Sequence, residues 1–500
     1  MNLPSLLAVA HPILVSGQAD QDVQGLTHDS RAVQEDFVFF ALPGSKTDGN
    51  RHVKDACARG ATAVVSELPP PPPPLGLSAA WIQVPDVLAA MGRMADLYFS
   101  HPSGALRVLG ITGTSGKTTT SYFLESILRA AGAKPGVLGT VSYRLSGQWE
   151  EPAVNTTPFS LETQRLLARF RDEGATHAVM EISSHALALK RVDEVDFDAA
   201  VFTNFRSDHL DFHKTVENYF EAKARLLDLL GKASSLKKKR LAALNADDAK
   251  THALERRASG ADVVLYGLGD NAAVRASNIE AGAEKTRFEL SFRGRRLKAE
   301  ITLVGEHNLY NALAAAAAAL GLGTDPEAVL AGLAALKSVP GRLEPVEAGQ
   351  NFKIFVDYAH TQDALEAVLA HLARLPHKRI ITVFGCGGQR DRTKRAPMGQ
   401  AARRSSDFII VTSDNPRGED PLEIIADIEA GLRTSGAKNY KIQPDRKKAV
   451  AEAVDMAREG DIVLIAGKGH ERSQILKDRT VAFDDRDAAR QAVRKKLGAP

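Results

Sequence analysis

The sequence contains few cysteines and has no excess of either charge. Its 500 residues include only 2 cysteines, Cys57 and Cys386, and neither sits in a metal-ligand spacing. This composition excludes a disulfide framework and is typical of a reducing compartment, so we expect a cytoplasmic protein. Lys and Arg number 64 against 61 Asp and Glu, which leaves a net charge of +3. That balance gives no electrostatic reason to expect a nucleic-acid partner.

Long hydrophobic runs are also absent. The longest, the alanine-rich segment 312–320, is too short to span a bilayer and predicts a buried helix. The first thirty residues contain no Lys or Arg and are interrupted by Pro4 and Pro12, so we expect no secretory signal and no membrane insertion. The basic run 237–240 is interpreted as a solvated loop because isolated charge runs usually lie at the surface.

The length indicates more than one domain. A chain of 500 residues exceeds what a single hydrophobic core supports, and its 44% apolar and 25% charged residues are ordinary for globular domains. Turn-rich segments at 101–104 and 338–341 mark two boundaries. We therefore predict α/β domains at residues 1–103, 104–337 and 338–500. In the second and third, apolar strands alternate with helical patterns, which is typical of parallel sheets covered on both faces.

A glycine-rich loop at 112–119 follows the apolar segment 107–111 and precedes an amphipathic helix. Strand, glycine turn and helix together point backbone N–H groups at a phosphate. Lys117 would then reach the terminal phosphates, and the Thr118 hydroxyl would face Mg²⁺. Ile111 stands where a standard P-loop has its first glycine, so a plain glycine turn before an ordinary helix stays open.

Polar residues follow two further strands of the predicted central sheet. Glu181 ends one apolar strand, and Asn204 and His209 follow the next. Ligands of parallel sheets gather at the carboxyl ends of strands, so these side chains suit a Mg²⁺-nucleotide site. The alternative is that a single Glu or His at a strand end is only a hydrogen-bonded structural residue.

Lys223 lies in a clearly helical segment, 219–227. One interpretation is a surface lysine flanked by salt-bridge partners. The other is a desolvated, neutral amine that adds CO₂ and becomes an anionic carbamate, which would supply an oxygen ligand for a hard cation. Residue pattern alone leaves both open.

The C-terminal third predicts a second parallel sheet with polar or glycine-rich strand ends. Arg390 and Arg417 could bind a carboxylate through paired N–H donors, and Glu471 could bind an ammonium group. These strand ends suggest a site for an anionic substrate. The strands are predicted at 352–356, 379–384, 408–412 and 462–466, and their ends at 357–360, 385–388, 414–417 and 467–471.

Taken together, these segments resemble the Mur ligase family, the ATP-dependent amide-forming enzymes of peptidoglycan precursor synthesis. Segment 112–119 fits the family's phosphate loop T-G-T-x-G-K-T-[ST], with Ser115 where Asn is frequent. Other family signatures are Glu181 before Ser-Ser-His, the Thr-Asn…Asp-His segment 203–209, the Tyr-x-x-Ala-Lys helix ending at Lys223, and segments 305–311 and 341–344.

The resemblance implies three domains: a small N-terminal one for the UDP end, a central P-loop ATPase-like one for ATP, and a Rossmann-like one for the incoming amino acid. The likeness is greatest to the diaminopimelate-adding branch. It implies a ligase that joins meso-2,6-diaminopimelate to UDP-N-acetylmuramoyl-L-Ala-D-Glu through an acyl phosphate, using ATP and Mg²⁺. Such an enzyme serves cell-wall biogenesis, and hence cell shape and division. We expect a monomer.

The resemblance also implies roles for particular residues. Catalytic roles fall to Lys117, His209 and Lys223. ATP contacts are implied for Gly113, Thr114, Ser115, Gly116, Lys117, Thr118, Thr119, Asn308, Arg342 and Asp357. Metal ligands are implied at Thr118, Glu181, His209 and Lys223, the last as its CO₂-derived carbamate, N6-carboxylysine.

For the two remaining substrates the implied contacts are as follows. The UDP-muramoyl dipeptide would contact Ser30, Ser45, Lys46, Thr47, Thr156, Thr157, Ser183 and Arg191, with Leu189 standing where related enzymes usually have Gln. The amino acid would contact Arg390, Asp414, Asn415, Pro416, Arg417, Gly467 and Glu471.

Segment 414–417, Asp-Asn-Pro-Arg, matches the family's diaminopimelate-type motif, and lysine-adding relatives usually lack its arginine. Diaminopimelate has a second carboxylate that lysine lacks, so a guanidinium paired with that carboxylate would disfavour lysine by several kcal/mol, roughly. Three alternatives stay open: a lysine-adding ligase, a folylpolyglutamate synthetase, and a nucleotide-dependent switch protein without ligase activity.

Overall fold

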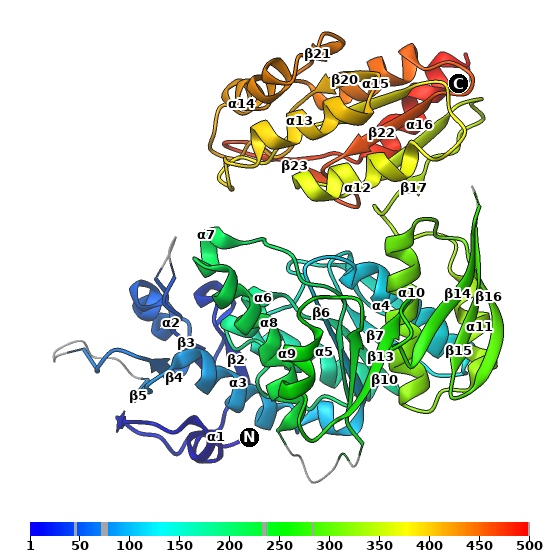
Figure 1. The fold of residues 1–500 in the computed structure, drawn as a ribbon. Coiled ribbons are helices and arrows are strands. Elements are labelled where there is room, and N and C mark those ends of the chain that lie inside the picture. The colour runs from blue at the N-terminus through cyan, green and yellow to red at the C-terminus, as the bar shows by residue number, and fades with distance from the viewer. Residues whose placement is uncertain (45–47, 72–78, 233–236, 238, 283–284, 499–500) are drawn as a thin grey trace. The chain divides into compact units, whose positions relative to one another are not determined.

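The computed structural model describes residues 1–500 except 45–47, 72–78, 233–236, 238, 283–284 and 499–500. Ser45, Lys46 and Thr47, predicted to contact UDP, therefore lie outside the described residues. The chain forms two compact units (Figure 1). The first comprises 1–278, 288–299 and 310–335, and the second comprises 279–287, 300–309 and 336–500.

The N-terminal hundred residues form a five-stranded sheet in the order β1-β5-β4-β3-β2, parallel except for the β1–β5 pair. Apolar residues of α1 and α3 pack on one face of this sheet, and those of α2 pack on the other. The apolar segments 36–42 and 61–65 contain β3 and β4. The elements are α1 Leu3–Ala10, β1 Leu14–Ser16, β2 Gly25–Thr27, η1 Ser30–Ala32, β3 Phe37–Phe40, η2 Gly49–His52, α2 Val53–Ala58, β4 Ala61–Ser66, β5 Ala80–Gln83 and α3 Val87–Tyr98.

A larger sheet follows in the order β16-β15-β14-β13-β12-β11-β6-β10-β7-β8-β9. From β7 to β14 its neighbours pair parallel, and β8 and β9 add an antiparallel edge. The strands are β6 Arg107–Thr112, β7 Pro135–Leu138, β8 Ser142–Leu145, β9 Trp149–Pro152, β10 His177–Glu181, β11 Ala199–Phe202, β12 Leu241–Asn245, β13 Asp262–Gly267, β14 Val274–Ala281, β15 Thr286–Phe292 and β16 Arg295–Ile301.

Helices cover this sheet because its strands are apolar on both faces. Side chains of α5 and α8 pack with Val108 and Met180 on one face, and α4 lies against β6 and β10 with Phe123 and Leu124 fully buried. The predicted helix at 312–320 is confirmed as the buried part of α10. The helices are η3 Pro102–Ala105, α4 Lys117–Ala130, α5 Ser160–Asp172, α6 Ser184–Ala188, α7 Leu210–His213, α8 Val216–Gly231, α9 Thr251–Arg257, α10 Glu306–Gly321 and α11 Pro326–Ala335.

In the described part of the basic run 237–240, Lys239 is exposed but the side chains of Lys237 and Arg240 are buried, so the prediction of a solvated loop was wrong for those two residues. The Lys237 ammonium is buried and pairs with Asp198 at 2.6 Å, and Arg240 pairs with Asp196 at 3.2 Å. Both cations also donate to backbone carbonyls. Their carboxylate partners lie about forty residues earlier in the chain, so the local charge pattern could not reveal them.

The C-terminal sheet has the order β17-β18-β22-β19-β20-β21, with parallel pairing from β18 to β21. All four predicted strands are confirmed, as β18, β19, β20 and β22. The elements are β17 Glu344–Pro345, β18 Lys353–Asp357, α12 Gln362–Leu372, β19 Ile380–Phe384, α13 Arg395–Ser405, β20 Phe408–Val411, α14 Pro421–Thr434, β21 Tyr440–Ile442, α15 Arg446–Met456, β22 Ile462–Ala466, β23 Ser473–Ile475, β24 Thr480–Ala482 and α16 Asp485–Lys496.

Two helical layers cover the C-terminal sheet, as Figure 1 shows. Apolar residues of α12, α13 and α14 pack on one face, and those of α15 and α16 pack on the other. No helix in the described part of the chain is both long and apolar enough to cross a bilayer.

A fully buried ion pair fixes α15 and α16 to the strand ends of this unit. The Arg446 guanidinium contacts both carboxylate oxygens of Asp485, at 2.7 and 2.8 Å, and both side chains are 0% exposed. Arg446 also donates to the carbonyls of Ser413, just after β20, and Ala466, at the end of β22. Desolvation is offset here by two parallel bonds and further acceptors, so the pair depends on both partners.

We expect Asp485→Ala to lower the free energy of unfolding of this unit by about 3–5 kcal/mol, because it leaves the Arg446 charge buried without a counter-charge. Hydrogen exchange of the β20 and β22 amides would measure the loss; tryptophan fluorescence would not, since Trp81 and Trp149 both lie in the other unit. The control is Asp487→Ala, which removes an exposed pair with Arg490 and should cost less than about 1 kcal/mol. Equal losses in the free energy of unfolding for Asp485→Ala and Asp487→Ala would contradict the stabilising role of the buried pair.

Candidate functional site

The glycine loop between β6 and α4 forms a phosphate-type cradle. Gly116 precedes α4 with a φ of 87° and, as a glycine, provides no side-chain cap of its own for that helix. An added Cβ would collide with the Asn311 amide at Gly116 and with Thr203 Oγ1 at Gly113. The loop is therefore restricted to glycine at both positions. The N–H groups at the start of α4 thus follow a glycine turn, a geometry that suits anion binding.

The side chains of this loop are ordered by neighbouring strand ends. Thr203 Oγ1 donates to the Ser115 carbonyl at 2.6 Å, and Asn204 Oδ1 accepts from the Ser115 N–H at 3.0 Å. The Lys117 ammonium donates to the carbonyls of Gly113 and Thr114 at 2.8 and 3.0 Å. Lys117 thus folds back over the loop, where it would face a bound phosphate.

Glu181 is the polar centre of this sheet edge. Its side chain lies at the end of β10, is 1% exposed, and accepts from Thr118 Oγ1 at 2.9 Å and from Thr140 Oγ1 at 2.7 Å. Ser121 Oγ and the Thr140 N–H complete its partners. The structure brings the two predicted metal ligands Thr118 and Glu181 into direct contact.

The oxygen atoms of Thr118 and Glu181 are suitable ligands for a hard cation. Carboxylate and hydroxyl oxygens are the ligands that Mg²⁺ prefers, and it usually takes few protein ligands beside nucleotide phosphates. Among the described residues, no three or more His, Cys, Asp or Glu side chains are grouped as a metal site on their own. The residues therefore suit a metal bound together with a nucleotide.

Lys223 is buried, so the surface interpretation is wrong. Its side chain is 1% exposed and its Nζ donates to the Gly113 carbonyl at 2.7 Å. Burial, reinforced by the nearby Lys117 charge, lowers the pKa of Lys223 well below its usual value. An amine with a depressed pKa has the neutral form that reacts with CO₂.

The Tyr219 ring connects Lys223 to His209. Lys223 Nζ lies 4.7 Å from the centre of this ring, and the His209 ring centre lies 6.0 Å from it. His209, partly exposed and in a left-handed conformation, contacts Asp208 at 3.5 Å. Partial burial and the Lys117 charge lower the pKa of His209 although Asp208 opposes this, so its ring favours the neutral form that binds metals.

Three of the predicted dipeptide-binding residues form one cluster beside Glu181. The Thr157 hydroxyl donates to the Glu181 carbonyl at 2.8 Å and accepts from the Ser183 N–H at 3.0 Å. Arg191 donates to the Thr157 carbonyl at 2.8 Å. Burial lowers the pKa of Arg191, and its Nε has no hydrogen-bond partner among the described residues, which leaves a donor for an anionic group.

The other predicted residues of this unit lie at the edges of the cluster. Thr156 Oγ1 lies 3.1 Å from Thr140 Oγ1, so it belongs to the Glu181 network. Leu189 caps the end of α6 through its backbone N–H. Ser30 is half-buried at the start of η1, and Thr119 is buried in the first turn of α4.

In the C-terminal unit, parallel pairing brings the four predicted strand ends together. The Asn415 amide donates to Glu471 Oε2 at 2.8 Å, and the Gly467 N–H donates to the Asp357 carbonyl at 3.0 Å. Asp414 accepts from the Asn415 N–H at 2.6 Å. Residues from β18, β20 and β22 therefore form one polar edge, and the buried Pro416 continues this edge toward Arg417.

Arg417 is half-buried at this edge and has a φ of 52°. Its guanidinium donates to the carbonyls of Gly388 and Asn415 at 3.0 and 3.3 Å, and no carboxylate of the described residues forms an ion pair with it. Burial and the neighbouring Arg390 charge lower the pKa of Arg417. The neighbouring positive charge of Arg390 makes this an anion-attracting position, although Asp414 and Glu471 oppose its effect on Arg417.

Arg342, Asp357 and Asn308 occupy structural positions in the second unit. Asp357 accepts from the Leu343 and Ala359 N–H groups, at 2.7 and 2.8 Å, and burial raises its pKa. Arg342 lies over the Tyr358 ring at 4.9 Å. Asn308 lies in the first turn of α10 and donates to the Val304 carbonyl at 2.9 Å. These contacts order their turns and neither support nor oppose the predicted ATP contacts.

Family models match three stretches of the chain. They are described as "Mur ligase family, catalytic domain" for residues 22–99, "Mur ligase middle domain" for 111–319 and "Mur ligase, glutamate ligase domain" for 341–469. A curated protein of Solibacter usitatus named UDP-N-acetylmuramoyl-L-alanyl-D-glutamate--2,6-diaminopimelate ligase is 47% identical over 476 residues, 95% of this chain and 94% of its own. The chain belongs to the Mur ligase family.

Other family members agree with this assignment. A protein of the same name from Geobacillus thermodenitrificans is 42% identical, over 99% of this chain and 100% of its own. A solved structure of an enzyme with that name is 33% identical, covers 99% of both chains and has a TM-score of 0.67. The α/β fold class and the three-domain Mur ligase architecture predicted from the sequence are thereby confirmed, as is the resemblance.

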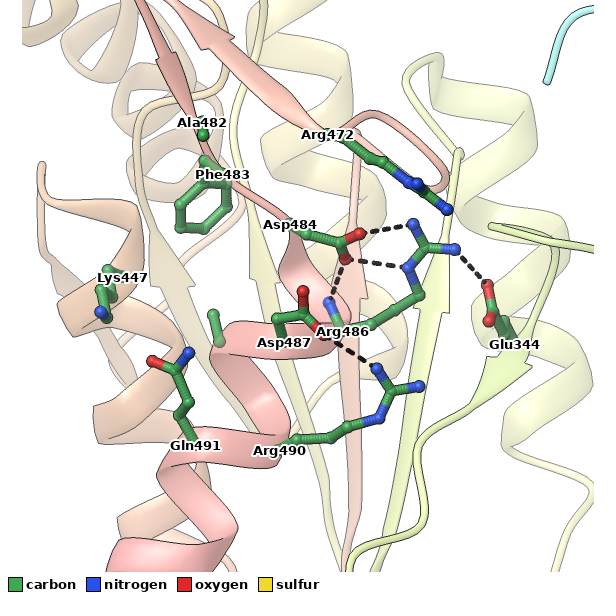
Figure 2. Close-up of a pocket in the computed structure, with 11 residues that line it drawn as sticks. Glu344, Lys447, Arg472, Ala482, Phe483, Asp484, Arg486, Asp487, Arg490 and Gln491 are labelled. Atoms are coloured by element: carbon green, nitrogen blue, oxygen red, sulfur yellow. Dashed lines mark hydrogen bonds and ion pairs between the residues drawn. The ribbon is translucent and has the colours of Figure 1, made fainter. Parts of the chain in front are cut away.

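A separate pocket of about 600 Å³ lies in the C-terminal unit of this Mur ligase (Figure 2). Arg486 bridges Asp484 and Glu344 at its wall, and Arg490 pairs with Asp487. None of the predicted site residues lines this pocket. It is therefore distinct from the candidate site.

Several residues of the site are not among those predicted from the sequence. Ser121 lies one helical turn after Lys117, so its position facing Glu181 could have been predicted from spacing. Thr140, which follows β7, and Tyr219, which lies in α8, reach the site only through the tertiary fold. Lys468, between two glycines at a predicted strand end, is fully buried and contacts both Asn415 and Glu471.

We expect Gly116→Ala to weaken ADP binding about tenfold or more, because its Cβ displaces Asn311 and distorts the loop. Titration with a fluorescent ADP analogue would measure the change. Gly132→Ala is the matched control: it has a similar φ of 75° but open space around the Cβ, so it should cost stability without changing nucleotide affinity. Equal effects of the two substitutions would refute the role of the loop.

Proposed function

We propose that this Mur ligase joins meso-2,6-diaminopimelate to UDP-N-acetylmuramoyl-L-alanyl-D-glutamate, with ATP as the activating substrate, in peptidoglycan precursor synthesis. The observation that carries this proposal is the half-buried guanidinium of Arg417, which forms no ion pair with a carboxylate of the described residues. It lies near Arg390, at an edge that also bears Glu471. The distal carboxylate of diaminopimelate would pair with Arg417, and an ammonium group with Glu471. The names of the relatives agree with this substrate.

The proposed chemistry has two balanced steps. An oxygen of the D-Glu γ-carboxylate attacks the γ-phosphorus of ATP, and the bond from that phosphorus to the β-phosphate oxygen breaks. The products are ADP and an acyl phosphate. The amine of diaminopimelate then attacks the acyl carbon, loses a proton and expels phosphate as the amide forms. Lys117 and the N–H groups of the loop stabilise the charge on the transferred phosphoryl group. Thr157, Ser183 and Arg191 orient the dipeptide.

Mg²⁺, when bound, would neutralise the charge between the reacting carboxylate and the phosphates. Thr118 and Glu181 would hold one ion, and His209 with a carbamate on Lys223 would hold a second. The buried amine of Lys223, whose pKa is lowered, supports the carbamate, because the anionic form would replace its electrostatic repulsion by Lys117 with attraction. Lys117, His209 and Lys223 are the residues to which we assign catalytic roles.

We further propose that the domains divide at residues 103 and 337, that the enzyme is a monomer and that it works in the cytoplasm. The division follows the stretches matched by the three family models. The free thiols of Cys57 and Cys386 agree with a reducing compartment.

We expect one lysine carbamate per chain after incubation with ¹³CO₂, and none in Lys223→Met, because the lowered pKa of the Lys223 amine favours the neutral form that adds CO₂. Carbon-13 NMR of the intact enzyme would detect it. Lys448→Met removes an exposed, charged lysine and should keep the signal. A signal that persists in Lys223→Met, or that is absent from the wild type, would overturn the modification.

The function is tested by phosphate release from ATP with the UDP-linked dipeptide and either meso-diaminopimelate or L-lysine. We expect release and tripeptide formation with diaminopimelate only. Arg417→Ala should lower kcat/KM for diaminopimelate by about 10²–10³-fold, since the distal carboxylate loses a charged partner. Arg392→Ala, which removes an exposed arginine of the adjacent loop, is the control and should change it little.

The outcomes separate the alternatives. Preference of the wild type for lysine would indicate a lysine-adding ligase and overturn the role of Arg417. Release with neither amino acid, in enzyme that binds ATP, would overturn the proposed function.

A further inference from the structure

Lys468 is a fully buried cation in the strand-end loop that follows β22. It stands between Gly467 and Gly469, with φ values of 113° and 55°, and its side chain is 0% exposed. An added Cβ at Gly467 would meet Asp414 Oδ2 at 2.8 Å, and one at Gly469 would meet Tyr358 Cβ at 2.8 Å. The flanking glycines thus let the loop fit closely between β20 and β18, with the lysine turned inward.

The Lys468 ammonium has two partners, and both belong to the proposed amino-acid site. It donates to Asn415 Oδ1 at 3.0 Å and to Glu471 Oε2 at 2.8 Å. The Ile475 N–H also donates to Asn415 Oδ1, at 2.9 Å, and the Asn415 Nδ2 donates to the same Glu471 oxygen. Two donors facing Oδ1 fix the orientation of the Asn415 amide, and two donors fix Glu471 Oε2.

This arrangement leaves specific groups for a ligand. Glu471 Oε1 has no hydrogen-bond partner among the described residues, and the Asn415 Nδ2 has a second proton to donate. Glu471 is itself partly exposed, with a side-chain exposure of 30%, so a ligand can reach it. The buried lysine therefore holds one oxygen of Glu471 and leaves the other to accept from an ammonium group.

We propose that Lys468 is a positioning residue for amino-acid specificity: it orients Glu471 and Asn415 so that together they receive one ammonium group and an adjacent carboxylate of the incoming amino acid. This inference rests on the proposed function and adds a residue that does not itself touch the substrate. Without Lys468, the Glu471 carboxylate loses its charged partner and can rotate.

The test is steady-state kinetics of phosphate release for the wild type, Lys468→Met, Glu471→Gln and the double variant. In Lys468→Met we expect KM for diaminopimelate to rise about 10–100-fold, as when a charged hydrogen bond is lost. The KM values for ATP and the UDP-linked dipeptide should change less than about threefold, because those substrates are bound elsewhere. In the Glu471→Gln background, Lys468→Met should raise this KM less than it does in the wild type, because the charged partner is already lost and only the bond to Asn415 remains.

Lys448→Met, an exposed lysine of α15, is the control and should match the wild type. If Lys468→Met does not fold, Lys468→Gln takes its place, since it removes the charge and keeps a donor. Unchanged KM for diaminopimelate in either folded variant, equal rises in all three KM values, or fully multiplicative effects in the double variant would overturn the inference. Absence of diaminopimelate-dependent release in the wild type would instead overturn the proposed function and this inference with it.

Discussion

Parallel pairing of β-strands is the constraint on which both halves of this chain depend. Parallel neighbours place all their carboxyl ends at one edge of a sheet, so residues far apart in sequence meet there. Glu181 meets Thr118 at one such edge, and Asn415 meets Glu471 at another. Helices on both faces exclude water from the strands, which leaves these edges as the places where polar groups of the sheets reach solvent and substrates.

Desolvation gives three buried lysines different chemistry according to their partners. Lys237 and Lys468 each face a carboxylate and serve as fixed cations. Lys223 faces the Gly113 carbonyl and lies near the Lys117 charge, so its protonated form is disfavoured. The same residue type therefore pairs with a carboxylate at two positions and has a lowered pKa at the third. Burial alone does not distinguish these roles, whereas the sign of the neighbouring charge does.

Close approach of backbone segments orders both candidate sites before any substrate binds. Gly113 and Gly116 allow the phosphate loop to contact Thr203 and Asn311. In the C-terminal unit, Gly467 allows the loop after β22 to contact Asp414. A loop fixed in this way loses little further conformational entropy on binding. Such ordering suits a reaction in which positioning and charge stabilisation supply most of the rate enhancement.

The sequence by itself determined the strands, the glycine loop and the family, because apolar periodicity and motif spacing are local properties. It also predicted that Thr118 and Glu181 would share a sheet edge, since both follow buried strands. Tertiary structure alone decided the environment of the cations. Lys223 meets the Gly113 carbonyl 110 residues away, and Lys237 pairs with Asp198, 39 residues away. The bond of Lys468 to Asn415 joins two strand ends 53 residues apart. Solvent exposure and charge neighbours depend on packing between such segments, and no local pattern encodes them.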